Sequence, residues 1–254
     1  MKLINHTVLM NKKLILIASI LVASTTMSCA QKLGKIKLPK SITNVTQSTG
    51  LTEEEIAKGL KEALTKGAKM ASDSLNKKDG FYGNPLVKIP FPPELTKMES
   101  TLRSMGLGKE IDKFILSLNR SAENAAIEAA PIFTKAITNM NIADAKAILQ
   151  GSDTSATSYL RKSTYDSLYK TFTPHIKKAL DNNYVASQWT NLATSYNKLP
   201  TTRTKVNTDI VAFTTGKALK GLFVKVAEEE GKIRHDVNAR TSDLLKKVFG
   251  SQTK

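Results

Sequence analysis

The sequence has few of the residues that build disulfides, metal sites and catalytic centres. It contains one cysteine and three histidines in 254 residues. A single cysteine excludes an intramolecular disulfide and a cysteine-rich zinc site. No His-x-x-x-His or Glu-x-x-His pair, no nucleophile elbow and no phosphate-binding glycine loop is present. We therefore expect no metal and no cofactor. Composition alone does not indicate which reaction or ligand the protein serves.

Acidic residues are absent from residues 1–28. In this segment basic residues are followed by an apolar run, as in a bacterial export signal. Lys12 and Lys13 precede a mainly apolar run over 14–23 that is too short for a comfortable membrane span. Cleavage before Cys29 would leave an acylated cysteine at the start of a lipoprotein, whereas cleavage before Gln31 would discard it. We favour the lipoprotein, because a lone cysteine at this position is otherwise a coincidence.

The composition is strongly basic, with 38 Lys and Arg against 22 Asp and Glu and a net charge of +16. A basic exported protein meets anionic phospholipid headgroups before it meets nucleic acid. No nucleic-acid recognition motif is present. The residue directly after Cys29 is not an aspartate. By analogy with the sorting of lipoproteins in other bacteria, this favours the outer membrane over the inner membrane. We expect an exported, periplasmic protein anchored to that membrane by the lipid on Cys29, with no nucleic-acid partner.

Residues 29–50 are predicted to form a tether, and residues 51–250 a single all-α domain. Lysines alternate with apolar residues over 32–40, which indicates a strip that adheres to a membrane or a solvated linker. Thr52 and Glu55 have capping-box spacing, and the apolar period after them is helical. No segment alternates like a strand, so we predict one bundle of about eight helices.

Prolines and capping residues set the expected helix boundaries. Pro131 is expected to kink or break a helix over 109–140. Asp153 is expected to cap a helix that ends at Phe172, because Thr173-Pro174 has the pattern of a new helix N-terminus.

A long proline-rich segment over 79–93 interrupts the helical pattern. It carries four of the eight prolines together with large apolar residues, so it should be extended but ordered. Loops of this length are often functional, and the alternative is a packed connection laid across the helices. The candidate binding residues are Asp79, Gly80, Phe81, Tyr82, Gly83, Asn84, Pro85 and Pro90.

Carboxylates fall on the apolar face of the helix predicted near the C-terminus. At 100° per residue Glu230 lies inside the apolar stripe and Glu229 at its edge, with Arg234 one turn after Glu230. A carboxylate directed at a core must be paired. We favour a buried ion pair, with Arg240 or Arg161 as further partners. The alternative is a hydrolase-like enzyme that uses Glu230 and the arginines on an anionic substrate.

Two other side-chain clusters have an open role. Arg120 and Glu123 lie opposite the main apolar stripe of their helix, so with Asn119 they are expected on a solvated face. A Tyr/Trp cluster between 159 and 196 forms either a pocket for an amphipathic ligand or ordinary core. Its members are Tyr159, Tyr165, Tyr169, Tyr184, Trp189 and Tyr196.

Several blocks of the chain resemble a bacterial family called domain of unknown function 4197. The resemblance begins at Asp79-Gly80-Phe81-Tyr82-Gly83-Asn84-Pro85 and continues through 118–123, 145–151 and 159–162 to 227–230 and 239–250. It implies an exported, helical protein and supplies no catalytic or binding residue. Our main hypothesis is a non-enzymatic envelope protein that binds a hydrophobic ligand or a partner protein.

Overall fold

The computed structural model describes residues 50–182, 184–198, 200 and 205–250. Cys29, the predicted export signal and the predicted tether up to residue 49 lie outside this part. The fold class is confirmed, because the described part contains nine α-helices and no β-strand. The helices are α1 (Glu53–Asn76), α2 (Thr96–Ser104), α3 (Gly108–Ala126), α4 (Ala129–Thr138), α5 (Ile142–Gln150), α6 (Ser155–Asp181), α7 (Val185–Asn197), α8 (Ile210–His235) and α9 (Asp243–Gly250).

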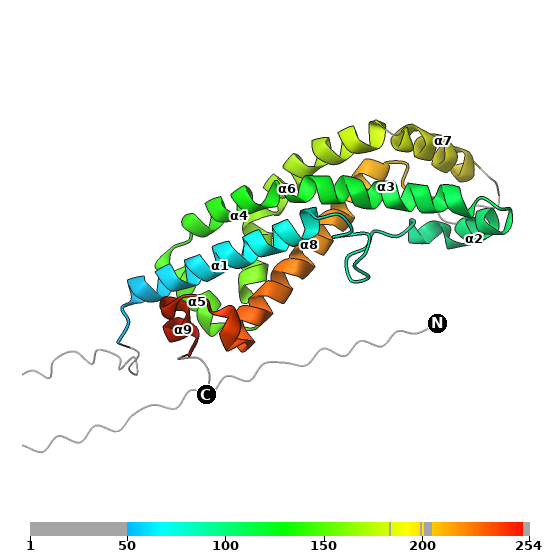
Figure 1. Cartoon of the computed structure of the whole chain (residues 1–254). Coiled ribbons are helices and arrows are strands. Elements are labelled where there is room, and N and C mark those ends of the chain that lie inside the picture. The colour runs from blue at the N-terminus through cyan, green and yellow to red at the C-terminus, as the bar shows by residue number, and fades with distance from the viewer. Residues whose placement is uncertain (1–49, 183, 199, 201–204, 251–254) are drawn as a thin grey trace, which may run out of the picture. The chain divides into compact units, whose positions relative to one another are not determined.

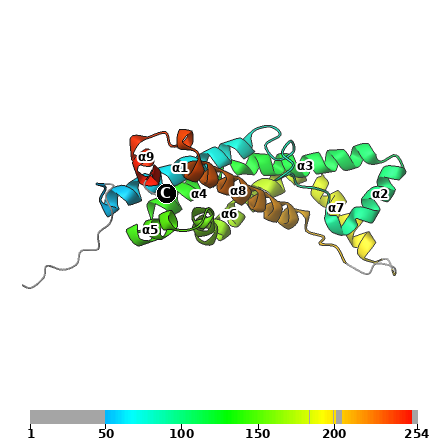
Figure 2. The ribbon, with the colours of Figure 1, turned by 90° about the horizontal axis from the view of Figure 1, so that it is seen from below.

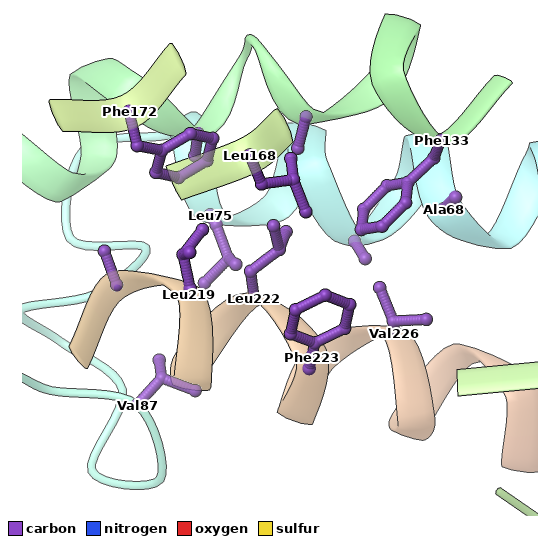
Figure 3. Close-up of a cluster of buried hydrophobic side chains, with 14 of the residues drawn as sticks. Ala68, Leu75, Val87, Phe133, Leu168, Phe172, Leu219, Leu222, Phe223 and Val226 are labelled. Atoms are coloured by element: carbon purple, nitrogen blue, oxygen red, sulfur yellow. The ribbon is translucent and has the colours of Figure 1, made fainter. Parts of the chain in front are cut away.

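Helices α1, α6 and α8 organise the core. Helix α8 packs against both α1 and α6, while α1 also contacts α4 and α5, and α6 also contacts α3 (Figure 1). Phe133 of α4, Phe172 of α6 and Leu222 and Phe223 of α8 are fully buried where these helices meet (Figure 3). The core therefore joins segments from the whole length of the described chain.

The N-terminal helices follow the predicted boundaries. The N–H of Thr52 donates to Glu55 Oε2 at 2.8 Å, and the N–H of Glu55 donates to Thr52 Oγ1 at 3.2 Å, which confirms the capping box. Helix α3 ends before Ile127 and Glu128, and Pro131 lies in the first turn of α4. The break falls here because a proline ring clashes with the carbonyl group four residues before it, which is that of Ile127.

The prediction that one helix ends at Phe172 and another begins at Thr173-Pro174 is wrong. Helix α6 continues through Pro174. A proline inside a helix costs about 3 kcal/mol, but an unbroken buried stripe on α6 outweighs this cost. Pro174 and Lys170 are exposed, so water can reach the carbonyl group that loses its partner. The stripe consists of Leu168, Phe172, Ile176 and Leu180, all fully buried.

Gly221 allows the proline-rich loop to touch α8. A Cβ atom at Gly221 would lie 2.8 Å from Phe81 Cε1 and 3.1 Å from Val87 Cβ. Phe81 is fully buried, so its ring has little room to move. The loop is therefore laid against α8 as well as connecting α1 to α2.

We expect Gly221→Ala to lower the free energy of unfolding by about 1–3 kcal/mol, because the new methyl group overpacks the contact with Phe81. Gly216→Ala is the matched control, since nothing lies within 4 Å of a Cβ at this position of the same helix. It should raise stability by up to about 1 kcal/mol through helix propensity. Urea unfolding of both variants checks the difference, and shifts of the same sign would contradict the close contact.

Candidate functional site

Glu230 is enclosed by hydrogen-bond donors. Glu230 is only 4% exposed. Oε1 accepts the N–H of Ala156 at 3.0 Å and the Arg234 guanidinium, and Oε2 accepts the N–H and the hydroxyl of Thr157, both at 2.8 Å. The small hollow beside it measures about 10 Å³, no more than a single water needs. The enzyme alternative needed an accessible Glu230 in an open cleft, and this carboxylate is sealed.

The Glu230–Arg234 ion pair connects the ends of two helices. The two backbone N–H groups that Glu230 binds belong to the first turn of α6, where they have no partner within the helix. Arg234 donates to the carbonyl oxygens of Ile148 at 2.8 Å and Leu149 at 3.3 Å, at the C-terminal end of α5. The negative Glu230 thus lies at the N-terminal end of α6, and the positive Arg234 lies at the C-terminal end of α5. The helix dipole favours both placements.

Asp153 does not cap α6, so that prediction is wrong. The N-cap residue is Thr154, whose side chain makes no capping hydrogen bond. Asp153 Oδ1 instead lies 3.0 Å from Nε2 of His235, on the exposed surface. Glu230 already occupies the N–H groups that a local cap would have bound.

The other predicted members of this polar cluster have separate partners. Glu229 is buried and forms an ion pair with Lys232 at 2.6 Å. Arg240 is buried too, but it donates to main-chain carbonyl groups at the end of α8. Arg161 is exposed, with its guanidinium 4.4 Å from the centroid of the Phe223 ring. Arg234 is the (i, i+4) partner of Glu230, as its spacing predicts, and within the described residues neither Arg240 nor Arg161 joins this ion pair as the expected further partner.

Buried side chains of α3 hold the proline-rich loop in place. Glu123, 3% exposed, accepts the N–H groups of Phe81 at 3.1 Å and Tyr82 at 3.0 Å through Oε1. Asn119 is fully buried, and it accepts the N–H of Ile89 and donates to the carbonyl oxygen of Ile89, both at 2.8 Å. The backbone of the loop thus hydrogen-bonds to two positions of α3, one turn apart.

Arg120 completes this attachment at the edge of the loop. Its guanidinium donates to Asp79 at 2.7 Å and to Glu123. The hydrogen bond with Glu123 is the main cause that raises the pKa of Arg120 above its ordinary value. The expectation of a solvated face at Asn119 and Glu123 is wrong, because the loop covers this side of α3.

The accessible residues of the proline-rich loop are few and lie mainly at its turn. Gly83, Pro85, Leu86, Lys88 and Pro90 are exposed, and Leu86 is 72% exposed. The other residues of the segment from 79 to 91 are at least partly covered, except for Asp79, which pairs with α3. Most of the predicted binding loop therefore serves as a packed connection, and its turn together with exposed Pro90 and Pro93 is free to contact another molecule.

An apolar groove opens between α2, α3 and α7, and we call it the aromatic groove. The rings of Phe114 and Trp189 stack with centroids 5.5 Å apart, and Phe91 lies 5.5 Å and 5.9 Å from them. Leu107 and Leu192 line the groove and are 41% and 39% exposed. The groove has a volume of about 160 Å³. It is an apolar hollow that solvent can reach.

A second, more polar hollow adjoins the aromatic groove. It has a volume of about 400 Å³ and shares Glu110, Phe114 and Gln188 with it. Lys113 and Ser117 of α3 add polar groups there. The two hollows together form one largely apolar surface, with more polar groups in the second hollow.

Sequence reasoning found only part of the aromatic groove. Trp189 belongs to the predicted Tyr/Trp cluster, but none of the five tyrosines of that cluster lines the groove. Tyr165 and Tyr169 stack on each other on α6, with centroids 6.3 Å apart. Phe91 and Phe114 come from the loop and from an apolar helix stripe, and no pattern in the sequence shows that they meet Trp189.

The described residues show neither a metal cluster nor a membrane helix. Nowhere among them do three or more His, Cys, Asp or Glu side chains gather closely enough to hold a metal ion. Of the helices in the same residues, none combines the length and the apolar character that a bilayer crossing requires.

The fold and the groove define an all-α helical protein with an apolar hollow on its surface. Residues 50–250 match the family model described as protein of unknown function (DUF4197), and the chain belongs to that family. The match confirms the resemblance that the sequence blocks indicate. No curated protein and no solved structure matches the chain.

Proposed function

We propose that this chain is an exported envelope protein that binds a partner protein through the aromatic groove. In this proposal an acylated Cys29 anchors it to the periplasmic face of the outer membrane. The lysines, the apolar run and the cysteine at the N-terminus support export and anchoring. The aromatic groove is the observation that carries the binding role.

The size and the rim of the groove favour a partner protein over a small molecule. Pockets for small molecules usually measure about 300–1,000 Å³. The aromatic groove measures only about 160 Å³, and the adjoining hollow of about 400 Å³ falls in that range but has Glu110, Lys113 and Gln188 in its lining. The volume of the aromatic groove suits one or two apolar side chains. Exposed Leu107 and Leu192, with Met105 at 69% exposure nearby, add apolar surface around the hollow. Aromatic hollows with such rims are typical anchor points of protein interfaces.

One wall of the groove has little to hold it rigidly. Helix α2 has no buried residue. Arg103 links it to α3 through an ion pair with Asp112 at 2.8 Å, while also contacting Glu99 of its own helix at 2.9 Å. Elements with few buried contacts open at low free-energy cost. Helix α2 can therefore shift to admit a side chain larger than the groove now holds.

The test uses a photocrosslinking amino acid at Leu192 in the native cell envelope, with Val237 as an exposed control position away from the groove. We expect one discrete protein adduct from position 192 and none from position 237. The captured protein is then purified, and its binding is followed by the fluorescence of Trp189, the single tryptophan. Leu107→Asp with Leu192→Asp should weaken binding about 30-fold or more, as loss of an interface anchor does, and Val237→Asp should not.

Native mass spectrometry of the mature protein from the same envelope supplies the opposing outcome. A stoichiometric small hydrophobic molecule, combined with no adduct at position 192, would overturn the partner-protein proposal in favour of a carrier. The same spectra report the N-terminus. A diacylated Cys29 supports the anchor, and an unmodified chain that starts at Gln31 contradicts it.

A further inference from the structure

Four cations around α8 have no carboxylate partner among the residues that the structure describes. Three of them lie over aromatic rings: Lys88 is 4.1 Å from the Tyr82 centroid, and Lys217 is 5.5 Å from that of Phe213, while Arg161 lies over Phe223 as described above. Lys220, three residues after Lys217 on α8, is exposed. Within the described residues, none of the four is within 4.0 Å of a carboxylate oxygen, unlike Lys225 and Lys232 of the same helix, which pair with Glu228 and Glu229.

These cations lie on one side of the helical unit. Figure 2 shows α8 in front, with the proline-rich loop on one side of it and α6 on the other. The loop touches α8 at Gly221 through Val87, and α6 contacts it at Phe223 through Arg161. Lys217 and Lys220 are within one turn of Gly221. We call the surface formed by Lys88, Arg161, Lys217 and Lys220 the basic face.

An apolar side chain projects beside these charges. Leu86 forms the turn of the loop and is 72% exposed. Its N–H donates to Asn84 Oδ1 at 3.1 Å, and the loop behind it is fixed to α3 through Asn119 and Glu123. The leucine is thus presented by a held backbone rather than by a free chain end.

We propose that the basic face lies against an anionic phospholipid membrane, with Leu86 inserted among the headgroups. Cations spread over a loop and two helices match a surface of many phosphates, and each lysine near such a surface contributes about 1 kcal/mol, which is about fivefold in binding. An exposed leucine two residues before Lys88 adds the apolar contact that interfacial proteins use. The proposal is independent of the aromatic groove, which α2, α3 and α7 form.

The test measures partition of the mature chain to vesicles of phosphatidylglycerol and phosphatidylcholine in equal parts. All proteins carry Cys29→Ser to remove acylation, and glutamine at Lys32, Lys35, Lys37 and Lys40 so that the tether adds no charge. Substitution of Lys88, Lys217 and Lys220 by glutamine should lower the partition coefficient about 100-fold. The matched control replaces Lys109, Lys135 and Lys178, which are exposed on α3, α4 and the end of α6, and should change it less than about fivefold.

Equal losses of partition coefficient in the two triple variants would overturn the proposal. Failure of the parent protein to bind the vesicles would also overturn it, and this result is expected if an acidic protein covers the basic face instead. Leu86→Trp in a Trp189→Phe background supplies an independent readout. Its emission should shift to shorter wavelength on phosphatidylglycerol vesicles and stay unchanged on phosphatidylcholine alone. Binding without that shift would contradict insertion of Leu86.

Discussion

Glu230→Ala is expected to lower the free energy of unfolding by about 3–5 kcal/mol, the usual cost of breaking a buried ion pair by removing one partner. The change leaves the Arg234 side chain, 10% exposed, without its carboxylate. It also leaves the N–H groups of Ala156 and Thr157 and the Thr157 hydroxyl without an acceptor. Urea unfolding followed by circular dichroism measures the loss.

The chain offers a closely matched control in Glu99 and Arg103. Both pairs place Glu four residues before Arg, with Oε1 and Nη2 at 2.9 Å, but the side chains of Glu99 and Arg103 are 25% and 37% exposed. Glu99→Ala should therefore cost less than about 1 kcal/mol. If Glu230→Ala does not fold, Glu230→Gln keeps the shape and can still be measured. Equal costs at positions 99 and 230 would show that burial and the helix-end hydrogen bonds contribute nothing.

Asn119→Ala is expected to release the middle of the proline-rich loop and to cost about 2–5 kcal/mol. It leaves the N–H and the carbonyl oxygen of fully buried Ile89 unpaired, and each unsatisfied group costs about 1–3 kcal/mol. Asn124→Ala, on the exposed side of the same helix, should stay within about 0.5 kcal/mol of the parent. Urea unfolding gives the free energies, and hydrogen exchange at Ile89 gives the local opening.

The loop connects this prediction to the aromatic groove. Phe91 follows Ile89 by two residues and lies 5.9 Å from Trp189. Release of Ile89 should therefore alter the emission of Trp189 in folded Asn119→Ala, while Asn124→Ala leaves it unchanged. A destabilised Asn119→Ala protein with unchanged exchange at Ile89 would show that another contact holds the loop.

Local patterns in the sequence predict the local structure well. The capping box at Thr52, the interruption caused by Pro131 and the (i, i+4) spacing of Glu230 and Arg234 each involve residues within one turn of each other. Helical periodicity alone establishes the all-α class, because the apolar stripes are long and no segment alternates. These features need no knowledge of which helices are neighbours.

The errors arise where distant segments meet. The helical wheel places Glu123 opposite the apolar stripe of its helix, but it cannot show that a loop about 41 residues earlier covers that side. Glu230 replaces the expected cap at Asp153 from a position 74 residues beyond Ala156. Pro174 indicates a helix end locally, and the buried stripe on both sides of it decides otherwise. In each case a tertiary contact outweighs a correct local preference.

Because Glu230 and Arg234 bind the ends of α5 and α6, they also affect the order in which the newly made chain can fold. Ribosomes make the residues of α5 and α6 before residues 230–234, so until then the C-terminal end of α5 and the N-terminal end of α6 lack the side chains that bind them in the folded protein. A nascent or truncated chain that stops before residue 230 contains every residue of these two helices but lacks the side chains that connect them. We therefore expect a premature stop within about the last tenth of the described chain to leave a degradable intermediate rather than a smaller working protein.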